Sequence, residues 1–209
     1  MNDHETVTAD LRLPDGAAGL LDGDPALLER LHAGLVREAA GRHLLDVAYT
    51  TVSTPVGRLL VAGTELGLVR VAYEAEGHDR VLELLADRVG PRVLRGSEPV
   101  ADAVAQLEAY FDGDRRGFDL RLDLRLASGF RRAVVEQLRA IGFGETRSYA
   151  EVARATGSPG AVRAVGTACA RNPLPVVVPC HRVVRSDGTP GEYVGGPAAK
   201  ATLLALERG

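Results

Sequence analysis

Residues 172–184 read NPLPVVVPCHRVV, and we expect the rest of the fold to be arranged around this stretch. Its three prolines exclude an ordinary helix, because proline lacks the amide donor and clashes with the preceding turn. The β-branched run 176–178 has the composition of a buried, extended segment. It leads into Cys180, His181 and Arg182, which place a thiol, an imidazole and a guanidinium in succession.

The adjacent Cys180 and His181 have two interpretations. A thiol reacts as the thiolate, and a nearby imidazole is a common means of lowering its pKa or accepting its proton. A free cysteine beside valines, however, is most often an inert core residue. Neighbours on an extended chain also point to opposite faces, so a water or a local bend would have to connect the two side chains. The stretch alone leaves both interpretations open.

The overall composition is that of an ordinary globular protein. The 209 residues are 45% hydrophobic and 25% charged, enough for one large domain or two small ones. No apolar run approaches the roughly 18 residues that span a bilayer, and the acidic, polar residues 1–16 do not resemble a secretory signal. With only two cysteines, we expect a reducing, cytoplasmic location and neither a disulfide framework nor a zinc site.

Charge is distributed unevenly along the chain. The net charge of the whole chain is −3. Residues 128–209 carry eleven basic and six acidic residues, whereas residues 1–127 carry 14 basic and 22 acidic residues. Such asymmetry indicates a face that binds a polyanion. A modest excess of arginine scattered over a solvated surface would give the same counts, so charge alone does not decide.

Residues 1–45 are predicted to be an N-terminal extension with one helix. Residues 1–23 lack clear periodicity and are expected to be loose. Asp24 and Pro25 form a good helix start, because aspartate caps and proline suits the first turn, and the helix should end near Gly41. The apolar stripe that should pack this helix on the rest of the protein consists of Leu27, Leu28, Leu31, Leu35 and Val36.

Residues 46–127 are predicted to form an α/β domain. Apolar residues alternate with polar ones between glycine- and proline-containing turns, which is typical of an antiparallel β-meander. Two helices should cover one face of it, and the charged segment 113–125 reads as an edge strand or a linker. The predicted strands lie at 47–51, 59–62 and 68–73, and the predicted helices at about 79–89 and 99–110, the second capped near Ser97.

Residues 128–209 are predicted to form a mostly helical domain. It contains two short helices separated by a tight glycine turn, which is the pattern of a helix-turn-helix. The second of these is rich in alanine and glycine, so it could lie equally close to DNA or to another helix. The predicted helices are 128–141, capped by Ser128, 149–155, capped by Ser148, 161–170, and 197–207.

In these segments the chain resembles the O6-alkylguanine-DNA alkyltransferases, also called methylated-DNA–protein-cysteine methyltransferases. The matching stretches are GETRSYAEVA (144–153), AVRAVGTACARNPLPVVVPCHRVV (161–184) and GEYVGGPAAKATLLALE (191–207). The resemblance is strong over residues 128–207 and weak before them. It implies an α+β fold, with an RNase H-like N-terminal domain and a C-terminal domain that contains a winged helix-turn-helix-like DNA-binding unit.

The resemblance implies direct DNA repair by a protein that is used once. Such proteins bind double-stranded DNA, flip an O6-alkylguanine out of the stack, and move the alkyl group irreversibly to their own cysteine, usually as monomers and without a cofactor. O4-alkylthymine is a second candidate substrate. By position Cys180 would accept the alkyl group, His181 would act as base through a bound water, and Glu207 would hold the other ring nitrogen.

Further site residues follow from the resemblance by position. Tyr149 would hydrogen-bond the flipped base, Arg163 would fill the vacated place in the stack, and Asn172 would tie the turn to the cysteine loop. The implied DNA-binding residues are Tyr149, Ala161, Arg163, Ala164, Gly166, Thr167 and Arg171, and the implied substrate-pocket residues are Pro175, Val183, Tyr193 and Val194.

Three other functions fit parts of the pattern. An alkyltransferase-like lesion sensor keeps the DNA-binding frame without the cysteine, and the presence of Cys180 argues against it. A cysteine hydrolase with a Cys/His/Glu triad would turn over and would not need the small-residue helix that carries Arg163. A plain DNA-binding domain would leave Cys180 inert.

Overall fold

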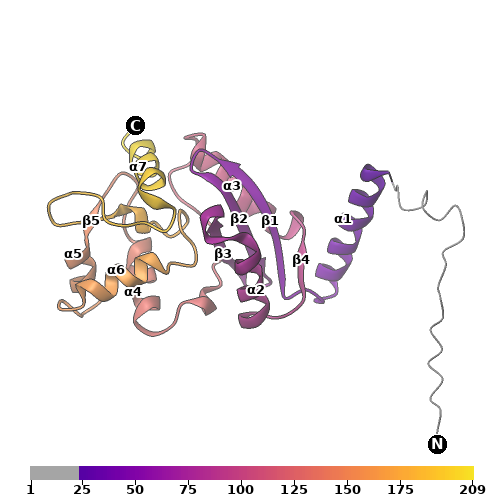
Figure 1. Cartoon of the computed structure of the whole chain (residues 1–209), viewed down its shortest axis with the longest axis horizontal. Helices are drawn as coiled ribbons and strands as arrows, with labels where there is room; N and C mark the ends of the chain where they lie inside the picture. The colour runs from indigo at the N-terminus through magenta and orange to yellow at the C-terminus, as the bar shows by residue number, and fades with distance from the viewer. Residues whose placement is uncertain (1–23) are drawn as a thin grey trace, which may run out of the picture.

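The computed structural model describes residues 24–209, so the prediction for residues 1–23 lies outside the described residues. Figure 1 shows a central sheet with helices beside it, a group of helices at one end, and helix α1 (Pro25–Gly41) at the opposite end. The mixed α+β class is as predicted. Within residues 24–209, no helix is long and apolar enough to cross a membrane.

The predicted meander is present, and a fourth strand extends it. Strands β1 (Val47–Thr54), β2 (Gly57–Thr64) and β3 (Gly67–Tyr73) pair in antiparallel fashion. Strand β4 (Val93–Arg95) pairs in parallel with β1, which gives the order β3-β2-β1-β4. The sheet is therefore mixed rather than purely antiparallel.

The prediction that two helices cover one face of the sheet is wrong. Helix α2 (His78–Arg88) packs on one face, where Leu60 lies, and helix α3 (Ala101–Phe111) packs on the other, where Leu59 lies. Both faces of β2 are apolar, so each needs its own helix. Ser97 makes no capping hydrogen bond with its side chain; a 3₁₀ turn (Glu98–Val100) begins there instead.

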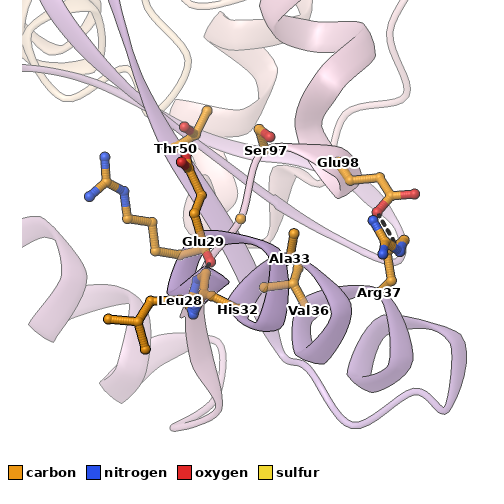
Figure 2. Close-up of a pocket in the computed structure, with 11 residues that line it drawn as sticks. Leu28, Glu29, His32, Ala33, Val36, Arg37, Thr50, Ser97 and Glu98 are labelled. Carbon is orange, nitrogen blue, oxygen red and sulfur yellow. Dashed lines mark hydrogen bonds and ion pairs between the residues drawn. The ribbon is translucent and has the colours of Figure 1, made fainter. Parts of the chain in front are cut away.

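Helix α1 departs from its predicted packing. Asp24 caps it as predicted, accepting a hydrogen bond from the Ala26 amide. Of the predicted stripe only Val36 is buried, against Gly96, where a β-carbon would clash with it. The four leucines (Leu27, Leu28, Leu31 and Leu35) are 44% to 62% exposed, so their predicted packing is wrong. Figure 2 shows the groove of about 690 Å³ between α1 and the residues Thr50, Ser97 and Glu98.

The C-terminal half contains the predicted helix pair. The capping box between Ser148 and Glu151 begins α5, because each residue satisfies the other's backbone amide. The side chain of Ser128 makes no such bond, although its position before α4 is as predicted. The elements of this half are α4 (Gly129–Arg139), β5 (Arg147–Ser148), α5 (Tyr149–Ala155), α6 (Val162–Ala170), β6 (Val183–Val184, parallel to β5) and α7 (Gly196–Leu206).

One hydrophobic core joins the two halves. Tyr110 of α3, Leu138 of α4 and Leu203 of α7 belong to the same buried cluster. The connecting segment 113–125 contains no strand of the main sheet apart from one isolated bridge, between Leu122 and Leu68, so it is mainly a linker. The residues around Cys180 are thus supported from both halves.

Candidate active site

The loop that leads to Cys180 is held by the side chain of Asn172. Asn172 Nδ2 donates to Val178 O (2.8 Å) and to Cys180 Sγ (3.1 Å), and Oδ1 accepts from Leu174 N (3.0 Å). All four residues are buried. The side chain thereby supplies bonds inside a proline-rich loop that cannot form a regular ladder.

The run 176–178 is buried as predicted, but it is not extended. Val178 N donates to Leu174 O (2.7 Å), which closes a turn. Val176 has a φ of 73°, which a β-branched residue rarely adopts. The bonds of Asn172 and the close packing of the loop override the extended preference of valine here, and the turn brings Cys180 back toward Asn172.

Cys180 begins a 3₁₀ turn, Cys180–Arg182, and its side chain is buried, with 2% of the residue exposed. Burial raises the pKa of the thiol to about 11, while the hydrogen bond from Asn172 and the charge of Lys200 act in the opposite direction. Within residues 24–209 both cysteines, Cys169 and Cys180, are free thiols. At neutral pH this thiol needs a proton acceptor in order to react.

The His181 side chain is buried beside Glu207. Its Nε2 lies 2.9 Å from Glu207 Oε1, and among the described residues its buried Nδ1 has no hydrogen-bond partner. Burial lowers the pKa of His181, although the Glu207 carboxylate acts in the opposite direction. A neutral ring that donates Nε2–H to Glu207 leaves the Nδ1 lone pair available as a base. No direct hydrogen bond joins this ring to Cys180 in the described chain.

Glu207 is the centre of a buried polar network. Besides His181, it accepts hydrogen bonds from Arg182 (2.7 and 2.8 Å), the Tyr110 hydroxyl (2.6 Å) and Gly144 N (3.2 Å). Burial acts to raise the pKa of this carboxyl, but the hydrogen bonds from His181 and Arg182 outweigh it and hold the pKa at about 2. Glu207 is therefore an anion that fixes the orientation of the imidazole.

Two members of this environment were not predicted as site residues. Tyr110 comes from the first half of the chain, and nothing in its local sequence indicates contact with Glu207. Lys200 is fully buried on α7, donates to Val183 O (2.6 Å) and has no carboxylate partner among the described residues. It is the only lysine of the chain and lies on the inner side of the last helix, which could have signalled a special role.

Tyr193 lies beside His181 and contacts Tyr73, and Tyr149 lies against the glycine-rich loop. The Tyr193 ring packs edge-on against Tyr73, with the hydroxyl oxygens 3.0 Å apart, and its centroid lies 6.3 Å from that of His181. The Tyr149 ring lies so close to Gly191 that a β-carbon there would overlap the tyrosine hydroxyl. Burial raises the pKa of Tyr149 to about 12, so its hydroxyl stays a proton donor at neutral pH.

The predicted substrate-pocket residues are buried or half-buried. Pro175 and Val183 are buried, and Tyr193 and Val194 are half-buried. Cys180 itself is only 2% exposed. Within residues 24–209, no group of three or more His, Cys, Asp or Glu side chains is arranged to hold a metal ion.

Helix α6 presents a smooth outer face. Arg163, Ala164 and Thr167 are exposed, while Val165, Ala168 and Cys169 point into the core. The other predicted DNA-binding residues are the half-buried Ala161 and Gly166 and the exposed Arg171. Small side chains on this face permit a close approach, and Arg163 is the only long side chain at its start. Figure 1 places α6 at the end of the molecule opposite α1.

Comparison with known proteins covers most of the chain. Residues 47–124 match the family described as 6-O-methylguanine DNA methyltransferase, ribonuclease-like domain, and residues 129–209 match its DNA binding domain. A methylated-DNA–protein-cysteine methyltransferase of Mycolicibacterium paratuberculosis is 44% identical over 171 residues, which cover 78% of this chain and 93% of that protein. The constitutive methylated-DNA–protein-cysteine methyltransferase of Bacillus subtilis is 39% identical, and the match covers 77% of this chain and 94% of that protein.

Solved structures show the same fold. The crystal structure of Mycobacterium tuberculosis O6-methylguanine methyltransferase aligns with a TM-score of 0.67 and 38% identity, covering 78% of this chain and 93% of that one. The structure of the M. tuberculosis OGT in complex with DNA aligns with a TM-score of 0.65 and 36% identity, covering 77% of this chain and 92% of that one. Helix α1 precedes the segments that the family descriptions match.

Proposed function

This chain belongs to the methylated-DNA–protein-cysteine methyltransferase family, and we propose that Cys180 is the residue on which it receives the alkyl group. The chain repairs alkylated DNA by transfer to one of its own cysteines. The observation that supports Cys180 is its position between Asn172, which bonds the sulfur, and the His181–Glu207 pair. Cys169, the other thiol, is buried in α6 and has no such partners among the residues that the structure describes.

The contacts support a base-assisted displacement. His181 Nδ1 would take the thiol proton through a water, since adjacent residues do not bond directly, and Glu207 would stabilise the resulting imidazolium. The thiolate then attacks the alkyl carbon of O6-alkylguanine: the S–C bond forms, the C–O6 bond breaks, and guanine leaves with the electron pair and takes up a proton. Lys200 supplies a buried positive charge that favours the thiolate.

The product explains why one chain should act once. A thioether is a poor leaving group, so the alkyl group stays on Cys180. As the resemblance to the family implies, we expect the monomer to be the acting unit. A thiol acceptor must stay reduced, which favours the cytoplasm.

In this proposal residues 128–209 form the DNA-binding alkyltransferase domain and residues 46–127 support it, while residues 1–45 are an extension.

The substrate assignment can be tested by mass. Incubation with a duplex that carries O6-methylguanine is expected to add about 14 Da to the peptide that contains Cys180, with saturation at one methyl per chain. A duplex with O4-methylthymine tests the second candidate substrate in the same assay. Continued turnover of the alkylated duplex would instead indicate a hydrolase, and an unmodified protein that binds the duplex would indicate a DNA-binding domain.

Arg163 is expected to support base flipping. From the first turn of α6 its exposed guanidinium can enter the stack and replace the flipped base. Because a stacking contact contributes about 1–3 kcal/mol, Arg163→Ala should slow transfer at sub-saturating DNA by roughly tenfold or more. Single-turnover rates check this, with thermal unfolding to show that the fold is intact. A wild-type rate for Arg163→Ala would contradict the role.

Gly191 is expected to be needed for the position of Tyr149. The methyl group of Gly191→Ala would overlap the tyrosine hydroxyl and ring, so the side chain must move. We expect transfer to O6-methylguanine to slow by at least about tenfold, as a small displacement of a positioning group does. Gly188→Ala is a control in the preceding turn, where a β-carbon meets nothing within 4 Å, although its φ of 80° makes it strained. A normal rate for Gly191→Ala would show that transfer does not need the close contact between Gly191 and Tyr149.

A further inference from the structure

A cleft rich in arginine lies where the two halves of the protein meet. It has a volume of about 440 Å³, and its walls come from β3, α2, α4 and the end of α6. Among the residues that line it, only Glu76 is acidic. The five arginines that line it are Arg70, Arg88, Arg125, Arg131 and Arg171.

Three of these guanidinium groups have no carboxylate partner among residues 24–209. Arg70 pairs with Glu76 and also donates to Asn172 O, and Arg125 pairs with Asp123. Within the described part of the chain, Arg88 and Arg171 form no ion pair, and Arg131 donates only to the Leu126 carbonyl (3.3 Å). Like charges that face one cleft repel each other, and a bound anion would remove that repulsion.

The cleft is continuous with the outer face of α6. Arg171 is the C-terminal cap residue of that helix, and Arg131 lies in the first turn of α4, which packs against it. A duplex lying on α6 would run past this end of the helix. Phosphodiester oxygens are the anions that such a duplex presents, and arginine binds them through paired N–H donors.

We infer that the cleft binds backbone phosphate of the DNA that docks on α6, so that the ribonuclease-like half contributes to the DNA interface through Arg88. The inference rests on the proposed docking of α6 and is independent of the chemistry at Cys180. Arg70 connects the cleft to the site, since it donates to the carbonyl of Asn172, whose side chain bonds Cys180 Sγ.

The salt dependence of DNA binding tests this inference. Each phosphate contact contributes about 0.9 to the slope of log affinity against log salt. Arg88→Ala and Arg131→Ala should therefore each reduce the slope by about 0.9, and the double variant by about 1.8. Fluorescence anisotropy with an unmodified duplex across a NaCl series gives the slopes. A variant with both Arg88→Lys and Arg131→Lys keeps the two positive charges, so its salt slope should stay close to that of the wild type.

Arg30→Ala is the matched control. Arg30 is exposed on α1, at the end of the molecule away from α6. Charges further from the DNA than the screening distance of about 8 Å have little effect on binding, so Arg30→Ala should leave the slope unchanged. A wild-type slope in the double variant would overturn the inference. Calorimetry with inorganic phosphate covers the other source of the anion. If the wild type binds phosphate, the double variant does not, and the salt slope of the double variant is normal, the cleft binds free phosphate and the inference is overturned. At saturating DNA the double variant should still accept one methyl group, which separates this test from that of Cys180.

Discussion

Replacement of Cys180 by serine is expected to abolish alkyl transfer and to leave DNA binding unchanged. A hydroxyl is nearly the same size as the thiol, so Asn172 can still bond it and the turn Cys180–Arg182 should form. Its oxygen, however, is far less acidic and less nucleophilic than sulfur, and His181 alone cannot compensate. We expect the single-turnover rate on O6-methylguanine duplex to fall by more than about 10³-fold.

Cys169→Ala provides the control for that experiment. It removes the second thiol, which lies on the buried side of α6, and it should keep one methyl per chain. Affinity for unmodified duplex should match the wild type in both variants, because neither side chain lies on the outer face of α6. A methyl group recovered on Cys180→Ser protein would show that another residue is the acceptor.

Local patterns predicted the parts of the fold that local chemistry determines. The alternation in 47–73 gave the three antiparallel strands, and Ser148 with Glu151 gave the start of α5. The resemblance in the segments 161–184 and 191–207 placed His181 and Glu207 together, and their side chains are in contact although 26 residues separate them. Periodicity could not have shown that contact, since it depends on how α7 packs on the cysteine loop.

The wrong predictions share one cause, which is packing that no local pattern encodes. Strand β4 has only three residues, so alternation is not detectable, and its pairing with β1 is set by the path of α2. The run 176–178 reads as a strand, yet Asn172 and the packing of the loop hold it in a turn. The leucines of α1 are apolar at helical spacing, but only the side that carries Val36 packs on the chain, at Gly96 just after β4.

Replacement of Glu207 by alanine is expected to destabilise the protein strongly. The carboxylate is the only acidic partner of the buried Arg182 among the described residues, and it also bonds His181 and Tyr110. Removing one member of a buried ion pair costs about 3–5 kcal/mol, because the other charge stays buried without compensation. For a chain of this size that lowers the melting temperature by roughly 10 °C. Thermal and urea unfolding would measure it.

Glu207→Gln removes the negative charge of this side chain but keeps its size and shape. It therefore tests how much of the stability of the protein depends on the ionised carboxylate, and so on pH. The folded-state pKa of about 2 lies below the ordinary value of 4.5, so the carboxylate stabilises the fold fully above pH 4.5, and this contribution is lost as the pH falls from 4.5 toward 2. Wild-type stability should therefore decline over that interval, and the decline should be smaller in Glu207→Gln, which is already less stable at neutral pH. Parallel acid-unfolding curves for the two proteins would show that Glu207 is not the group responsible. Because the same carboxylate orients His181, the glutamine variant should also transfer methyl groups more slowly at pH 7, where its fold is still intact.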